Sequence, residues 1–132
     1  MKKTITILSI IIVMTMLNSF KNPIQSSYGP WNKTSCYRGI DYCVKRASYN
    51  DVAKKYEWWV KFRNNYQTTV SFSFIAKESN VRSAETSSRL TVRSGEDGSN
   101  WFLLADANSI RVFVDRLRFG DDNGGKYAPC DN

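Results

Sequence analysis

Two short runs of alternating residues, separated by the polar stretch 64–68, constrain the fold of this chain more than any other feature. In the first run, 56–63, every even-numbered residue is apolar or aromatic, and the odd-numbered residues are Glu57, Trp59, Lys61 and Arg63. In the second run, 70–74, valine and phenylalanine alternate with serine. Because successive side chains of a strand point to opposite faces, both runs predict half-buried β-strands.

The apolar positions are even-numbered in both runs, and this shared parity limits how the two strands can pair. Opposed residues of an antiparallel pair share a face, so their numbers must add to an even number. We therefore expect a hairpin with an odd-length loop centred on Tyr66, in which Phe62 pairs with Val70. Asn64 and Asn65 accept the left-handed backbone conformation that such loops use.

The remaining strand signals are short and spaced as in an all-β domain. Alternation or brief apolar runs mark 37–46, 88–92, 101–105 and 110–119, whereas 47–55, 76–87 and 120–132 indicate a connection, a long exposed loop and a flexible polar tail. In the last strand the apolar phase changes near Asp115 and Arg116, which predicts a β-bulge or the end of the strand. We expect an all-β fold, a small antiparallel β-sandwich of about six strands, with a small open barrel as the alternative.

The amino terminus has the pattern of a secretory signal. A basic start, Met1 to Lys3, precedes the uncharged run Thr4 to Phe20, as in an n-region followed by an h-region. The run is at the lower length limit for a membrane-spanning anchor and contains several polar residues. We expect a signal peptide and lead-in over 1–27, cleaved within 19–27, and a single domain over 28–132 with no membrane span. The predicted location is secreted or periplasmic, and the pattern is typical of bacterial export.

Three cysteines, Cys36, Cys43 and Cys130, allow one disulfide in an exported chain. A bond between Cys36 and Cys130 would leave the alternation of residues 40–44 intact and close a long loop, which favours stabilisation. A bond between Cys36 and Cys43 would need a tight turn at Gly39 and would break that alternation. We therefore favour the Cys36–Cys130 disulfide.

Charge and composition argue against several classes of function. The formal net charge of +7 falls to +5 without Lys2 and Lys3, and the basic residues are dispersed, so we expect no nucleic-acid partner. The chain has no histidine, which excludes histidine-activated nucleophiles and histidine-bound metals. Its carboxylates lie mostly in turns, so we predict a protein without catalytic residues, with a carboxylate-based hydrolase as the alternative.

Two acidic, glycine-containing stretches, 95–100 and 120–125, have oxygen ligands of the kind that Ca²⁺ prefers. Neither matches the EF-hand pattern, and both are explained as turns. We therefore predict no metal-binding residues and no cofactor, with Ca²⁺ at these turns as the alternative.

A candidate binding surface follows from the adjacent pair Trp58 and Trp59, because only one of them can enter the core of a half-buried strand. Trp59 shares the polar face with two basic residues, and Phe113 lies between Arg111 and Asp115 in a similar setting. Exposed aromatic rings beside cations can stack on a sugar or an apolar ligand. The candidate ligand-binding residues are Trp59, Lys61, Arg63, Phe113 and Arg111. The alternative is that the lead-in with Trp31, the 76–87 loop or another subunit covers Trp59.

These patterns together predict an exported, non-catalytic binding module of the cell envelope or secreted fraction, whose partner is a glycan or a protein. The glycan would bind through the aromatic and basic strand face. The alternative is a protein-interaction or structural envelope component, such as an inhibitor or an adhesin-like subunit, with no small ligand.

Overall fold

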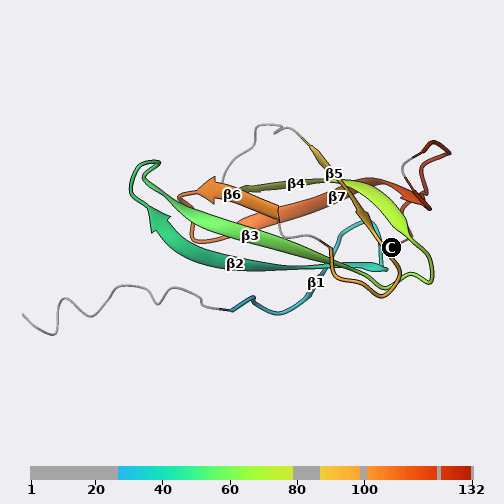
Figure 1. Cartoon of the computed structure of the whole chain (residues 1–132), viewed down its shortest axis with the longest axis horizontal. Coiled ribbons are helices and arrows are strands. Elements are labelled where there is room, and N and C mark those ends of the chain that lie inside the picture. Colours follow the sequence, from blue (N-terminus) through green and yellow to red (C-terminus); the bar gives the residue numbers. More distant parts are fainter. Residues whose placement is uncertain (1–26, 79–86, 99–100, 122, 132) are drawn as a thin grey trace, which may run out of the picture.

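The computed structural model describes residues 27–78, 87–98, 101–121 and 123–131, so residues 1–26 of the predicted signal peptide and lead-in over 1–27 lie outside them. Within these described residues, seven strands form two antiparallel sheets (Figure 1). The first sheet has the order β1-β2-β3-β6, with β1 at Asn32–Lys33, β2 at Ile40–Asn50, β3 at Lys55–Asn64 and β6 at Trp101–Ala105. The second has the order β5-β4-β7, with β5 at Ser88–Val92, β4 at Val70–Glu78 and β7 at Ile110–Phe119. The predicted all-β sandwich is confirmed.

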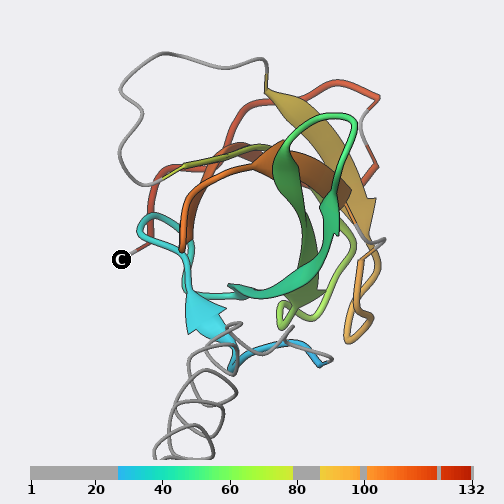
Figure 2. The same ribbon diagram turned by 90° about the vertical axis from the view of Figure 1, so that its left-hand side faces the viewer.

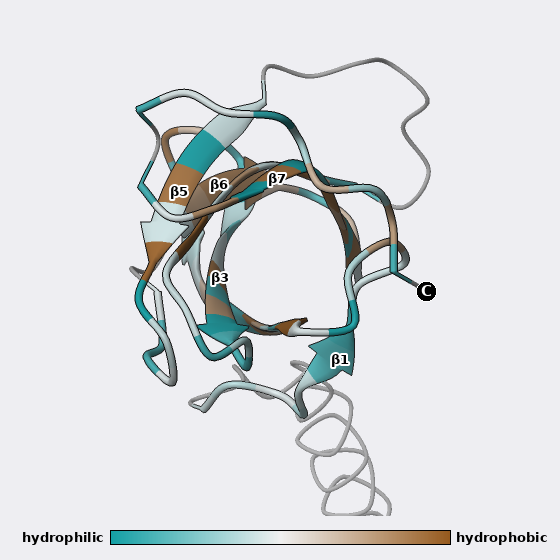
Figure 3. Cartoon of the chain, turned by 90° about the vertical axis from the view of Figure 1, so that its right-hand side faces the viewer, coloured by the Kyte–Doolittle hydropathy of each residue, from teal (hydrophilic) through white to brown (hydrophobic). Residues whose placement is uncertain are grey.

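The two sheets curve around one shared core. Seen along the strands, they enclose it almost as a ring (Figure 2), and hydrophobic stretches of β5 and β6 lie along this enclosure (Figure 3). The even-numbered residues of β3 and β4 point inward, as their alternation predicted. The ring of Phe62 lies 5.2 Å from that of Phe72 and 4.7 Å from that of Phe74. These contacts between the sheets form the centre of the core.

The predicted hairpin of β3 and β4 is wrong. β3 pairs with β2 and β6, and β4 pairs with β5 and β7, so the two strands lie in different sheets. Phe62 and Val70 are both fully buried, but the chain crosses between the layers after Asn64. Packing two apolar faces against each other satisfies the same parity as pairing them side by side, because inward residues of both sheets interdigitate. Parity alone therefore did not distinguish the two arrangements.

β2 extends further than predicted, because residues 47–50, predicted as part of a connection, continue the strand in a hairpin with β3. The pairing shifts in register between Arg46 and Tyr49 and then resumes. At the turn, the side-chain oxygen of Asn50 accepts hydrogen bonds from the backbone nitrogens of Val52 and Ala53, at 3.1 and 2.9 Å. This side-chain bonding closes the turn without a glycine.

β7 contains the predicted bulge. Ser73 pairs with Asp115 and Ser71 with Arg118, so β7 has one residue more than β4 between these pairs. Arg116 has a φ of 47°, and Leu117, the residue after it, is fully buried. Because the strand continues to Phe119, the change of phase is a bulge and not the end of the strand.

Asn64 and Asn65 do not adopt the left-handed conformation that was predicted for them. Asn64 is instead fully buried at the end of β3. Its side-chain nitrogen donates to the carbonyl oxygens of Thr68 and Val92, at 2.8 and 3.0 Å, and its oxygen accepts from the backbone nitrogen of Tyr66 at 2.9 Å. This one amide therefore joins β3 to the crossing loop and to the end of β5.

The last residues of the chain are not the free tail that their composition predicted. Cys36 and Cys130 form the favoured disulfide, with 4.7 Å between their Cα atoms, and Cys43 is a buried free thiol. The carboxylate of Asp131 accepts hydrogen bonds from the backbone nitrogen of Arg38 and the hydroxyl of Tyr66, at 2.7 and 2.6 Å. The residue that follows Cys130 is thus held to the domain by hydrogen bonds in addition to the disulfide.

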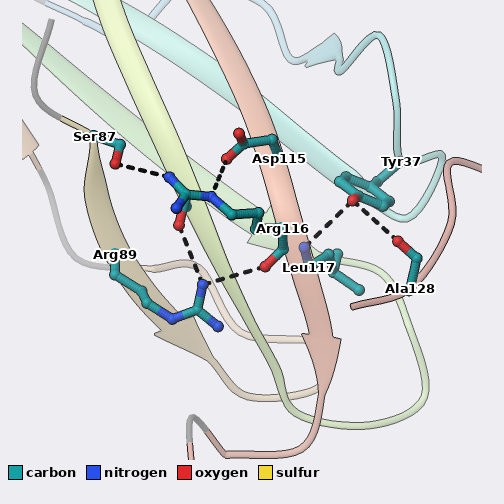
Figure 4. Close-up of polar contacts among 8 residues, drawn as sticks. Tyr37, Ser87, Arg89, Asp115, Arg116, Leu117 and Ala128 are labelled. Carbon is teal, nitrogen blue, oxygen red and sulfur yellow. Dashed lines mark hydrogen bonds and ion pairs between the residues drawn. The ribbon is translucent and has the colours of Figure 1, made fainter. Parts of the chain in front are cut away.

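A second set of contacts holds the carboxyl-terminal segment before the disulfide. The hydroxyl of Tyr37 donates to the carbonyl oxygen of Ala128 and accepts from the backbone nitrogen of Leu117, both at 3.3 Å (Figure 4). Tyr37 is itself a buried core residue. The connection between β1 and β2, the strand β7 and the carboxyl-terminal segment therefore meet at one side chain.

Candidate functional site

The outer face of the four-stranded sheet carries three of the five predicted site residues. Trp59, Lys61 and Arg63 follow one another along it on β3. In register, Trp59 lies opposite Lys45 of β2 on one side and Phe102 of β6 on the other. The sheet therefore places a cation and a second aromatic residue beside Trp59.

Lys61 and Arg63 are engaged by a residue from the segment that follows β5. Asp97 forms ion pairs with Lys61 Nζ and with Arg63 Nε, each at 3.0 Å. Burial by itself would raise the pKa of Asp97, but hydrogen bonds from Arg63 and Lys61 outweigh it and lower that pKa. Two of the predicted ligand-binding cations thus have an internal carboxylate partner.

The lead-in covers the same part of the face. Lys61 Nζ lies 5.8 Å from the ring centre of Tyr28, and Arg63 Cζ lies 3.9 Å from that of Trp31. The backbone nitrogen of Gly29 donates to the carbonyl oxygen of Val44 at 2.9 Å and holds this segment on β2. Cation–π contacts of this kind stabilise by about 0.5–1 kcal/mol at exposed sites. The alternative predicted that the lead-in with Trp31 covers Trp59, whereas the cation–π contacts of Tyr28 and Trp31 are with Lys61 and Arg63.

Cys43 lies opposite Lys61 in register and is buried. Burial raises the pKa of its thiol, against an opposing effect of Lys61. Because the thiolate is the reactive form of cysteine, this environment makes Cys43 a structural residue rather than a nucleophile.

Trp59 belongs to a more open part of the face. Its ring centre lies 5.5 Å from that of Phe102, whose side chain is 42% exposed, whereas Trp58 is 4% exposed in the core. Trp59 itself is half-buried. The two adjacent tryptophans therefore have different surroundings, and only Trp59 contributes to an accessible aromatic surface.

Phe113 and Arg111 lie on the other sheet. Both are exposed on β7, where they pair with Ile75 and Lys77 of β4, and Lys77 Nζ is 5.5 Å from the ring centre of Phe113. The five predicted residues therefore lie in three separate surroundings and do not form one surface. Phe102, which the sequence analysis did not select, was detectable only as an aromatic residue in a short apolar run.

The two acidic turns approach each other at one end of the molecule. A hollow of about 370 Å³ is lined by residues of both turns, among them Glu96, Asp97 and Asp121, together with Arg93. The carboxylate of Asp97 is already paired with two cations. Among the described residues, no group of three or more acidic or cysteine side chains is arranged to hold a metal ion.

No protein-family model, curated protein or solved structure matches this chain. The function must therefore be argued from its own residues. Within the part of the chain that is described, no helix has the length and apolar character needed to cross a bilayer.

Proposed function

We propose that this protein is an exported, non-catalytic binding module, and that the Trp59–Phe102 pair binds a glycan. The observation that carries the proposal is an accessible pair of aromatic rings on the outer face of a sheet. Aromatic faces offer a large apolar contact at low cost in conformational entropy. Such rings suit the flat, partly apolar surface of a sugar.

Lys45 supplies the polar contact that would orient such a ligand. It lies directly across from Trp59, and its ammonium group has three hydrogen-bond donors. Glu57, two residues before Trp59 on the same strand, adds an acceptor. All of these residues lie on paired strands, so the surface is organised before binding.

Export is part of the proposal. The signal pattern of residues 1–26 lies outside the described residues, and the Cys36–Cys130 disulfide supports an oxidising location. Because Tyr28 and Trp31 pack on β3, we expect signal cleavage before Tyr28. The location is therefore proposed to be secreted or periplasmic.

The proposal is tested by a glycan screen of the mature protein, followed by calorimetric titration of Trp59→Ala and Phe102→Ala. Loss of one stacked ring should weaken binding by about tenfold. Tyr49→Ala, at an exposed aromatic residue near the tip of the β2–β3 hairpin, is the matched control and should bind normally. Unchanged affinity in Trp59→Ala, or equal loss in Tyr49→Ala, would contradict the proposal.

A protein-interaction role is the second candidate, and β6 favours it. This strand has the sequence WFLLA without a charge, and β3 is its only strand neighbour among the described residues. Edge strands without charges are templates for strand addition by another chain. Light scattering over a range of concentrations, without glycan, distinguishes the two candidates. The protein-interaction role predicts oligomers that the substitution Phe102→Lys dissociates, whereas glycan binding alone predicts a monomer.

A further inference from the structure

The hairpin of β2 and β3 extends beyond β6, the strand that lies beside it in the sheet. β6 ends at Ala105, which pairs with Tyr56 of β3. The pairing of β2 with β3 continues past this point to Asn50 and Lys55. In Figure 1 the turn between β2 and β3 lies past the arrow of β6, at one end of the molecule. Residues 49–55, the hairpin tip, therefore project from the domain as a two-stranded ribbon.

The turn of the hairpin tip is closed by its own side chain and exposes a valine. The side-chain oxygen of Asn50 accepts hydrogen bonds from the backbone nitrogens of Val52 and Ala53, and Lys54 follows with a φ of 55°. Val52 is 96% exposed, more than any other large hydrophobic side chain in the described part of the chain. The turn is thus formed before any partner is bound, and it holds an apolar side chain in solvent.

Two tyrosines connect the hairpin tip to the core. The register shift after Arg46 places Tyr49 directly opposite Tyr56, so the two side chains share a face of the hairpin. Their ring centres lie 5.0 Å apart in an edge-to-face arrangement. Tyr56 packs against the core, whereas Tyr49 is 41% exposed. The core face of the hairpin therefore continues into the tip with an exposed aromatic ring.

The charge around the hairpin tip is positive. Residues 45–57 have a net charge of +2, from Lys45, Arg46, Lys54 and Lys55 against Asp51 and Glu57. Lys54 and Lys55 are exposed and follow Val52 within the tip, whereas the other two cations are half-buried. Asp51 is also exposed in the turn, and its charge opposes that of the lysines for any anionic partner. Two exposed cations thus lie beside an apolar side chain at the end of a projecting ribbon.

We propose that the hairpin tip docks this protein on an anionic lipid bilayer. Val52 enters the boundary between the headgroups and the acyl chains, and Lys54 and Lys55 contact lipid phosphates. A bilayer surface offers an apolar layer beneath negative groups, and tyrosine and lysine suit this boundary because each has an apolar body and a polar end. The hairpin tip shares no residue with the Trp59–Phe102 pair, and the proposal does not depend on glycan binding.

The shape of the hairpin tip favours a bilayer over an acidic protein as the partner. A specific protein interface buries roughly 1,200–2,000 Å², and the tip of one two-stranded ribbon offers only a part of that area. A fluid bilayer, by contrast, can close around a narrow projection. One valine and two lysines give weak and reversible binding, because even a single acyl chain binds a bilayer only marginally. The hairpin tip therefore concentrates the protein at a membrane and does not anchor it permanently.

The test is cosedimentation of the mature protein at low salt with vesicles of phosphatidylglycerol and phosphatidylcholine in equal parts. Vesicles of phosphatidylcholine alone are the comparison without net charge and should bind little protein. The double variant Lys54→Gln/Lys55→Gln should lower the partition coefficient by about tenfold or more, and Val52→Ser by about tenfold. Asp51→Asn removes the opposing charge and should raise the partition coefficient by about fivefold.

A control outside the hairpin separates docking by the tip from a general effect of net charge. Arg93→Gln/Lys126→Gln removes two exposed cations elsewhere and should bind within about twofold of the parent protein. Trp59→Ala should retain vesicle binding, and thermal unfolding checks that each variant is folded. Equal loss in the control, unchanged binding in Val52→Ser, or no binding to the anionic vesicles would overturn the proposal. So would binding of soluble polyglutamate as tight as that of the vesicles, which would assign the tip to an acidic protein.

Discussion

Replacing Asn64 by alanine tests the account of how the two sheets are joined. The side chain is fully buried and makes three hydrogen bonds, to the carbonyl oxygens of Thr68 and Val92 and from the backbone nitrogen of Tyr66. Its backbone also bonds to the segment after β5, through Glu96 and Gly95, and the substitution leaves these bonds in place. The substitution therefore isolates the contribution of the amide side chain.

The expected loss follows from the number and burial of these bonds. Each contributes about 1 kcal/mol net, and a buried carbonyl left without a partner costs about 1–3 kcal/mol more. Because the hydrogen bond to the Val92 carbonyl oxygen is buried, we expect the free energy of unfolding to fall by about 4–6 kcal/mol. That is a large part of the roughly 5–15 kcal/mol that stabilises a small domain.

The assay is urea unfolding followed by tryptophan fluorescence, with the disulfide intact. Asn65→Ala is the matched control: this exposed neighbour makes one side-chain hydrogen bond, to Asp41 at 3.0 Å, and should cost about 1 kcal/mol. With unchanged slopes of about 2 kcal/mol per M urea, the midpoint of Asn64→Ala should fall by roughly 2–3 M urea. A loss in Asn64→Ala no larger than that in Asn65→Ala would refute the reasoning.

Two further predictions concern the carboxyl-terminal segment. The double variant Cys36→Ala/Cys130→Ala opens a loop with a sequence separation of 94 residues and should lose about 4–5 kcal/mol in urea unfolding by the chain-entropy estimate, so a loss below about 1 kcal/mol contradicts it. Burial, and then the hydrogen bond to Asp131, raises the pKa of Tyr66 from 10.0 to about 12. The native state then holds this proton more tightly than the unfolded state between these values, so its contribution to stability is present below pH 10 and is lost as the pH rises to 12. Tyr66→Phe should show a shallower loss of stability between pH 9 and about 11.5, and identical slopes in both proteins would count against the assignment.

Much of the fold was predictable because the alternation of residues is a local property. It placed Phe62 and Phe72 in the core, and it indicated six of the seven strands. The missing strand, β1, has two residues and forms only by pairing with β2. The bulge in β7 was also visible, because an extra residue shifts the apolar phase of the strand itself.

The candidate site was less predictable for a physical reason. The sequence indicated that Trp59 lies on an outer face, but it contained no sign that Asp97 would form ion pairs with Lys61 and Arg63, or that Phe102 would lie beside Trp59. These contacts join residues far apart in the chain. Pairing between distant segments leaves no periodic signal in either of them.

The sequence by itself determined which side chains of each strand point inward, the preference for a Cys36–Cys130 bond and the separation of Trp58 from Trp59. Only the tertiary structure decided that β3 and β4 pack face to face, and that the predicted cations divide between a covered face and an open one. Side-chain alternation specifies a face, because the strand backbone imposes a period of two. It does not specify which strand or segment covers that face, because several partners can bury the same apolar surface with the same parity.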